Sequence, residues 1–308
     1  MAEYVIETQQ LTRYFGRTGA VRELDLAVPR GCVFGFLGRN GAGKTTTIRM
    51  LLGLLEPTRG AATVLRQDSR TLSPAGRARI GYLAEGHHVY GWMRVAECGR
   101  FQRSFYARWN EELYRNVVEY FGLEPDTRVR DLSRGQRAGL CLALTLAPDP
   151  ELLILDDPAL GLDPVARRAL LEAMVYVTRQ ADRTIFFSSH LVDDVERVAD
   201  RIAILDHGRL RACCTVDEFR RRVQRVVLHF SGPPPAVPDI PGLLHARRTE
   251  RELSLTIANC DERTEALLGR LGAARREPVA LDLEEAFIDY VGVRGAARPL
   301  VPESGGAA

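Results

Sequence analysis

The chain has 308 residues, of which 45% are hydrophobic, so it can bury a sizeable core and we expect more than one domain. Its 42 basic residues nearly balance its 40 acidic ones, which leaves no electrostatic footprint for nucleic acid. No apolar run approaches the roughly 20 residues that cross a bilayer, and the six cysteines lack metal-binding spacing. We therefore predict a cytoplasmic, mixed α/β protein without a nucleic-acid partner.

The N-terminal region combines strands with a glycine-rich loop. Residues 5–11 and 24–28 predict two alternating strands. The apolar run 32–37 is followed by Gly-Arg-Asn-Gly-Ala-Gly-Lys-Thr at 38–45, which fits the pattern G-x-x-x-x-G-K-[ST]. A helical pattern at 46–55 comes next, so the loop connects a strand to a helix.

This context makes the loop a candidate phosphate site. The glycines let backbone N–H groups turn onto phosphate oxygens, and the helix dipole adds to the attraction. Lys44 supplies a positive charge, and Thr45 is placed to ligate Mg²⁺. The alternative is a glycine-rich turn that binds nothing, and the downstream motifs argue against it.

A helical region follows from about residue 87 to residue 148. Asn110 marks a helix start, and Ser133 is an N-cap that leads into the helical pattern 138–147. Both tryptophans and four other aromatic residues gather in the first part of this region. They are Tyr90, Trp92, Phe101, Phe105, Tyr106 and Trp109.

Two carboxylates follow a short apolar strand. The run 152–155 predicts a buried strand, and Asp156 and Asp157 come directly after it. Nucleotide sites form at the carboxyl ends of parallel strands. There Asp156 can hold Mg²⁺, and Asp157 can orient or deprotonate an attacking water. A further strand at 184–187 ends close to His190.

The composition changes near residue 230, where Ser-Gly-Pro-Pro-Pro cannot sit in a central strand or a helix interior. We place a domain boundary there or shortly before. The expected division is a first domain at 1–222 with its helical part at about 87–148, and a small α+β domain at 223–293. The tail at 294–308, rich in Gly, Ala and Pro, is expected to be disordered.

These motifs, in this order and at these spacings, resemble the nucleotide-binding subunit of the ABC transporter ATPases over roughly residues 3–215. By this resemblance, 38–45 is the Walker A loop and 152–156 is the Walker B strand. Leu-Ser-Arg-Gly-Gln at 132–136 stands for the L-S-G-G-Q signature. The implied fold is an α/β P-loop NTPase of the ABC type, with a mixed sheet core and a helical subdomain.

The resemblance also assigns single residues. Asp163 is the D-loop aspartate, and His190 is the switch histidine. Glu85 occupies the Q-loop position, where a glutamine normally reaches the metal and senses the membrane partner. Phe15 falls at the aromatic position that stacks on adenine, with Tyr14 as the nearby alternative.

The implied site residues fall into four groups. Nucleotide binding is assigned to Phe15, Gly38, Arg39, Asn40, Gly41, Ala42, Gly43, Lys44, Thr45 and Thr46. Catalysis is assigned to Asp157, His190 and Glu85, and the metal is assigned to Thr45, Glu85 and Asp156. The signature residues, which act on the nucleotide of a second cassette, are Ser133, Arg134, Gly135 and Gln136.

Three departures from the family pattern bear on mechanism. Asp157 stands where the family usually carries a glutamate, and a water held about 1 Å off position costs on the order of 10²-fold in rate, so slow turnover is expected. Glu85 in place of glutamine adds a negative charge and cannot donate a hydrogen bond. Arg134 replaces a glycine, either as an added phosphate contact or as a solvated arginine at a helix start.

The resemblance implies an ATPase that uses ATP and Mg²⁺ and drives a separate membrane-spanning permease subunit. Two cassettes, identical or different, would close head to tail over ATP, at the inner face of the cell membrane. The aromatic group after Glu85 is expected to form mostly subdomain core, with some members exposed to dock the permease.

The C-terminal part resembles the accessory domain of ABC-2-type exporter ATPases, with cues that suggest the YtrB-like subgroup. A slow-hydrolysing nucleotide switch in a membrane complex remains the alternative. The chain lacks the second cassette of ribosome-acting ABC proteins, the coiled coil of chromosome ATPases and the Asn-Lys-x-Asp stretch of GTPases.

Overall fold

The computed structural model describes residues 3–181 and 183–292. The chain divides into two compact units, Met1–Arg211 and Ala212–Ala308. The division falls before the boundary expected after residue 222, so the helix α8 (Val216–Arg222) belongs to the second unit. The tail at 294–308 lies outside the described residues.

The first unit begins with an antiparallel sheet whose strand order is β2-β1-β4-β5. Its hairpin pairs Phe15 with Thr18 across the turn, and both strands extend beyond the predicted ranges. Leu11, Leu24 and Val28 are fully buried, as the alternating pattern predicts. The strands are β1 (Tyr4–Phe15), β2 (Thr18–Pro29), β4 (Arg59–Val64) and β5 (Gln67–Asp68).

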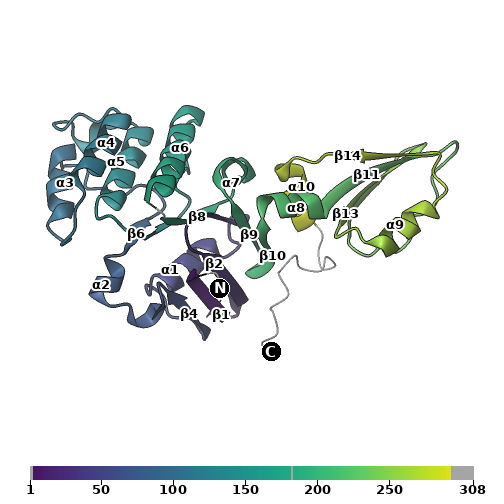
Figure 1. The fold of residues 1–308 in the computed structure, drawn as a ribbon, viewed down its shortest axis with the longest axis horizontal. Coiled ribbons are helices and arrows are strands. Elements are labelled where there is room, and N and C mark those ends of the chain that lie inside the picture. Colours follow the sequence, from purple (N-terminus) through teal and green to yellow (C-terminus); the bar gives the residue numbers. More distant parts are fainter. Residues whose placement is uncertain (1–2, 182, 293–308) are drawn as a thin grey trace. The chain divides into compact units, whose positions relative to one another are not determined.

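A second sheet of six strands, in the order β10-β9-β3-β8-β7-β6, forms the centre of the first unit, whose limit at Arg211 falls within β10 (Figure 1). The pairs β3·β8, β3·β9, β7·β8 and β6·β7 are parallel. Every residue of β3, β7 and β8 is buried, which explains the continuous apolar character of β3 and β7. The strands are β3 (Val33–Leu37), β6 (Ile80–Leu83), β7 (Leu152–Leu155), β8 (Thr184–Ser189), β9 (Arg201–Asp206) and β10 (Arg209–Thr215).

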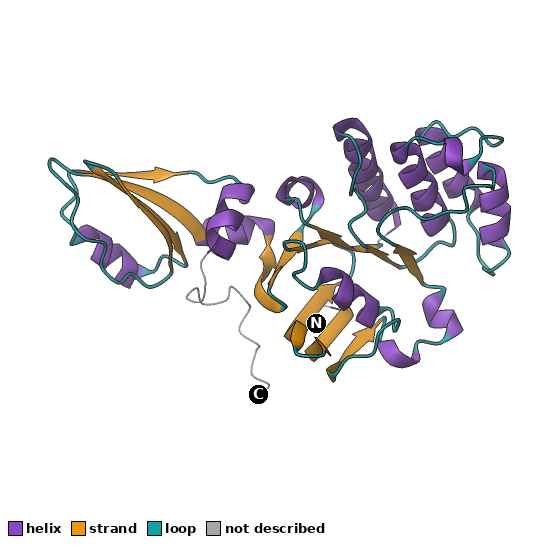
Figure 2. Ribbon diagram, turned by 180° about the vertical axis from the view of Figure 1, so that it is seen from behind, coloured by secondary structure: helices purple, strands orange, loops and turns teal. Residues whose placement is uncertain are grey.

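Helices cover this sheet and build the helical part of the unit, which Figure 2 shows in purple. Asn110 caps α4 by accepting a hydrogen bond from the Leu113 N–H (2.9 Å), as predicted. Gly139 on α5 is required by packing, because a Cβ atom there would lie 2.2 Å from the Phe121 ring. The helices are α1 (Lys44–Leu51), α2 (Pro74–Arg77), α3 (Val95–Arg103), α4 (Glu111–Tyr120), α5 (Arg134–Leu146), α6 (Pro164–Ala181) and α7 (Val192–Val198), with short 3₁₀ turns at Ser69–Thr71 and Val129–Asp131.

The helical part has its own core. Residues from α3, α5 and the intervening loops pack together, with Phe121 and Leu144 against them. The buried members are Met93, Val95, Cys98, Leu123, Val129, Leu132 and Leu140. No helix among the described residues combines the length and the apolar character that a membrane crossing requires.

The second unit is an antiparallel sheet in the order β12-β13-β11-β14, with helices of its own. Its core includes Leu228, Leu253 and Leu255. Phe219 and Tyr290 are fully buried, and their ring centroids are 5.4 Å apart, so the last helix packs within this unit. The elements are α8 (Val216–Arg222), β11 (Val223–His229), β12 (Leu243–Arg248), β13 (Glu252–Ala258), α9 (Glu262–Gly269), β14 (Arg275–Val279) and α10 (Leu283–Gly292).

Candidate functional site

The glycine-rich loop connects β3 to α1, as predicted. Gly41 and Gly43 have φ values of 80° and 107°, a region that favours glycine. A Cβ atom at Gly43 would lie 2.3 Å from the Ala20 carbonyl oxygen, so a larger residue would push the loop away from β2. No described side chain caps the N-terminus of α1, and its first N–H groups are therefore free to meet an anion.

Lys44 is a buried cation held by the loop itself. Only 7% of the residue is exposed, and its Nζ donates hydrogen bonds to the carbonyl oxygens of Gly38 (2.7 Å) and Arg39 (3.3 Å). Burial lowers the pKa of Lys44, and the nearby carboxylates Asp157, Asp156 and then Glu85 oppose that shift. The ammonium thus lacks a full ionic partner at hydrogen-bond distance among the described residues, which suits it to receive a phosphate.

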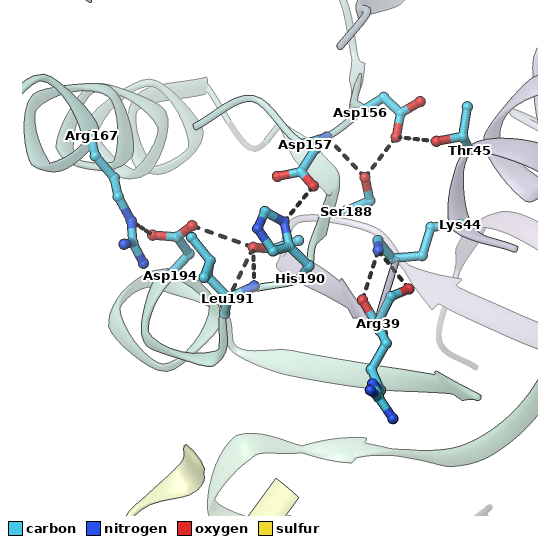
Figure 3. A network of polar contacts seen from close by, with 12 residues as sticks. Arg39, Lys44, Thr45, Asp156, Asp157, Arg167, Ser188, His190, Leu191 and Asp194 are labelled. Atoms are coloured by element: carbon cyan, nitrogen blue, oxygen red, sulfur yellow. Dashed lines mark hydrogen bonds and ion pairs between the residues drawn. The ribbon is translucent and has the colours of Figure 1, made fainter. Parts of the chain in front are cut away.

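Asp156 lies at the carboxyl end of β7 and is 1% exposed. Its Oδ1 accepts hydrogen bonds from Thr45 Oγ1 (3.1 Å) and Ser188 Oγ (2.8 Å), as Figure 3 shows. The hydroxyl and carboxylate oxygens of Thr45 and Asp156 are the hard donors that Mg²⁺ prefers. Their closeness fits a metal held by one or two protein groups together with phosphate oxygens.

Asp157 is joined to His190, the predicted switch histidine. Its backbone N–H donates to Ser188 Oγ (2.9 Å), and its Oδ2 lies 2.7 Å from His190 Nδ1 (Figure 3). The backbone of Asp157 has φ 46°, the left-handed region that aspartate tolerates better than most residues. This turn directs the Asp157 carboxylate toward His190 rather than along the strand.

These groups share one pocket of about 330 Å³. The pocket brings together the phosphate loop, both carboxylates after β7 and Glu85, which are separated along the chain. Its lining consists of Ala20, Asn40, Gly41, Gly43, Lys44, Thr45, Thr46, Glu85, Asp156, Asp157 and Leu160. All of these residues belong to the first unit.

Phe15 lies outside this lining, at the tip of the hairpin between β1 and β2. It is 49% exposed, and the Arg13 guanidinium lies 4.7 Å from the centre of its ring. Tyr14 is similarly exposed at 42%. Both aromatic residues are therefore accessible for stacking, and the geometry does not choose between them.

The signature residues also lie outside the pocket of their own chain. Ser133 caps α5 by accepting from the Gln136 N–H, and Gln136 Oε1 accepts from the Ser133 N–H, each at 3.1 Å. Gly135 packs tightly, since a Cβ atom there would lie 2.6 Å from Ala166. Arg134 is exposed and donates to the Gly161 carbonyl oxygen at 3.4 Å.

Asp163 caps the helix α6. Its Oδ1 accepts hydrogen bonds from the N–H groups of Val165 (2.9 Å) and Ala166 (3.0 Å). Asp163 is exposed and does not line the pocket. In this conformation the residue therefore has a structural role at the start of α6.

The structure adds two residues that the sequence interpretation did not assign. Ser188 bridges Asp156 and Asp157, and its position at the end of β8, in the triplet before His190, was the available signal. His87 is 6% exposed, and its Nε2 donates to the Pro158 carbonyl oxygen at 2.8 Å. Burial lowers the pKa of His87. No sequence pattern pairs residues 71 positions apart in this way.

Comparisons with known proteins agree with this geometry. A family model described as ABC transporter matches residues 21–160. The probable multidrug ABC transporter ATP-binding protein YbhF of Escherichia coli is 36% identical over 225 residues, which make up 71% of this chain but only 38% of that relative. The bacitracin transport ATP-binding protein BcrA of Bacillus licheniformis is 34% identical over 73% of this chain and 74% of the relative.

A solved structure described as the ATP binding subunit of an ABC transporter has the same fold. It aligns with a TM-score of 0.63 at 29% identity, over 70% of this chain and 92% of that chain. The predicted P-loop cassette fold is thereby confirmed. The chain belongs to the family of ABC transporter ATP-binding proteins.

Proposed function

We propose that this chain is the ATP-hydrolysing subunit of an ABC transporter and that it acts through a separate membrane-spanning permease. The observation that carries the proposal is the meeting of Lys44, Thr45, Asp156 and Asp157 in one pocket. These residues come from two stretches that lie more than a hundred positions apart in the sequence, and their chemistry suits a magnesium nucleotide.

Within this pocket each group has a distinct role. The N–H groups of the loop and the Lys44 ammonium bind the phosphates. Thr45 and Asp156, with Glu85 nearby, would hold Mg²⁺, which offsets phosphate charge when bound. Asp157 orients or deprotonates the attacking water, and His190 holds the Asp157 carboxylate through their 2.7 Å contact.

The signature supports a site completed by a second cassette. Ser133 uses its oxygen as an acceptor for the cap of α5, which leaves its hydroxyl proton free to donate to a phosphate. Ser133 and Arg134 are both exposed at this helix N-terminus, away from the pocket of their own chain. A second copy or a different cassette would place its nucleotide there.

The permease would dock on the helical part of the unit, at the inner face of the membrane. Four of the six grouped aromatics are exposed: Tyr90 by 57%, Trp92 by 67%, Phe101 by 42% and Phe105 by 67%. Tyr90 and Phe101 also line a pocket of about 390 Å³. Exposed aromatics beside a hollow provide anchors for a partner helix.

Transport direction is inferred from the relatives. A relative from Cupriavidus pinatubonensis, 35% identical over 67% of this chain, is named Nod factor export ATP-binding protein I. We therefore assign this chain to an exporter of the ABC-2 type, without a named cargo.

A second candidate is a slow-hydrolysing nucleotide switch. One observation favours it: Asp157 is shorter than the usual glutamate, and its carboxylate already contacts His190. The turnover rate of the wild-type protein with its permease separates the two candidates.

The Lys44→Ala variant should lose ATP affinity by roughly 10- to 100-fold, because a charge-assisted phosphate contact contributes about 1.5–3 kcal/mol. The measurement is nucleotide binding by calorimetry. Arg49→Ala, an exposed cation on the same helix, is the matched control and should bind normally. Unchanged ATP affinity in a folded Lys44→Ala protein would contradict the assignment of the pocket.

The Asp157→Asn variant should keep ATP affinity within a few-fold but lose about 10²-fold or more in turnover, because the amide preserves shape and removes the base. Steady-state phosphate release together with ATP binding measures both effects. Asp193→Asn, an exposed aspartate on α7, is the control. Turnover near the wild-type rate would place the catalytic carboxylate elsewhere.

The double variant Trp92→Ala and Phe105→Ala should reduce the amount of permease that co-purifies from solubilised membranes, while ATP binding stays unchanged. Tyr176→Ala, a 62% exposed aromatic on α6, is the control for loss of surface area. Equal recovery of the permease with the wild-type protein, the double variant and Tyr176→Ala would show that the docking surface lies elsewhere.

A further inference from the structure

A buried carboxylate on α7 lies between the helix after the D-loop and the switch histidine. Asp194 is 2% exposed and receives the Arg167 guanidinium from α6 on its Oδ1. Its Oδ2 lies 3.3 Å from Ser189 Oγ. Figure 3 shows the contact between Arg167 and Asp194, together with His190 and Asp157. All of these residues belong to the first unit.

Ser189 fixes the backbone on both sides of His190. It is the last residue of β8, and its Oγ accepts a hydrogen bond from the Leu191 N–H at 3.0 Å. The same hydroxyl lies 3.1 Å from the Leu191 carbonyl oxygen, so it can donate there or to Asp194. His190 is thus enclosed in a short turn whose shape depends on one serine.

Arg167 connects Asp194 to Asp163, the predicted D-loop aspartate. Its backbone N–H donates to the Asp163 carbonyl oxygen at 2.9 Å in the first turn of α6. The contacts therefore run from Asp163 through Arg167 and Asp194 to Ser189. From there the chain continues to His190 and the Asp157 carboxylate.

The burial of Asp194 makes these contacts sensitive to the loss of Arg167. Burial raises the pKa of Asp194, and the Arg167 guanidinium and the Ser189 hydroxyl oppose that effect by stabilising the charged form. A buried ion pair adds little net stability compared with an apolar pair, but removing one partner leaves an uncompensated charge. Asp194 without Arg167 would then seek another partner and disturb the turn around His190.

We propose that Arg167 and Asp194 are positioning residues that, through Ser189, hold His190 in contact with Asp157. The inference rests on the proposed ATP hydrolysis and adds the groups that set the histidine geometry. Neither Arg167 nor Asp194 lines the nucleotide pocket. They therefore act on turnover through His190 and leave nucleotide binding to the phosphate loop.

The test compares neighbouring arginines on one helix in the full-length protein. Arg167→Gln should lower kcat for ATP about 10- to 100-fold, as expected for a misplaced catalytic group, with the KM for ATP changed less than about 3-fold. Arg168→Gln is the matched control, since the Arg168 side chain is 68% exposed and forms an ion pair with Glu172 on the surface of the same helix. It should retain wild-type kcat. Arg167→Lys, which keeps the charge, should recover part of the loss.

Two further measurements separate positioning from a general structural role. Arg167→Gln combined with His190→Ala should be no slower than His190→Ala alone, because both changes disable the same group. Multiplying effects would contradict the proposal. If Arg167→Gln does not fold, Ser189→Ala provides the same test, since it breaks the turn without unpairing Asp194 from Arg167.

The outcomes also distinguish this inference from the proposed function. If the Lys44→Ala variant loses hydrolysis but the Arg167→Gln variant keeps the wild-type kcat, the positioning role alone would be overturned. Hydrolysis that survives Lys44→Ala would overturn the proposed function itself.

Discussion

The arrangement of the site depends on three neighbouring parallel strands, β3, β8 and β7, that end at the same edge of one sheet. The phosphate loop follows β3, the two aspartates follow β7, and His190 follows β8. Because the strands are buried on both faces, their ends are held in place by the core. Residues more than a hundred positions apart therefore meet within hydrogen-bond distance, as Thr45 and Asp156 do.

The edge of the sheet where these strands end brings buried charges of opposite sign together. Asp156, Asp157 and Lys44 are each at most 7% exposed, and the Lys44 ammonium is held by carbonyl oxygens instead of a direct carboxylate contact. Leaving charges poorly solvated costs stability, but it fixes their positions before a ligand arrives. Under the proposed function, a magnesium nucleotide would supply the missing partners: phosphate oxygens for Lys44, and a cation for Asp156. The site thus combines preorganisation with a need for its ligand.

Local sequence rules predicted the elements that carry the site and failed where tertiary contacts decide. The strand at 152–155 has the predicted bounds, and Asn110 and Ser133 cap helices as their side chains suggest. The edge strand β14 was missed because Arg-Arg-Glu-Pro has no apolar alternation. The domain boundary was expected after residue 222, shortly before the proline-rich segment, whereas the compact units divide at residue 211, because the division depends on tertiary contacts. The contact of His87 with the Pro158 carbonyl oxygen comes from folding, so no local pattern shows it, whereas Ser188 could be found only from its position shortly before His190.

The central claim is that ATP is hydrolysed between the phosphate loop of one cassette and the signature of another. The most direct measurement mixes two inactive variants, Lys44→Ala and Ser133→Arg, and follows ATP turnover. If the cassettes pair as proposed, a mixed dimer contains one site with both defects and one site with neither, so activity should return on mixing. A mixture that stays as inactive as either variant alone, although mixed dimers form, would contradict the account.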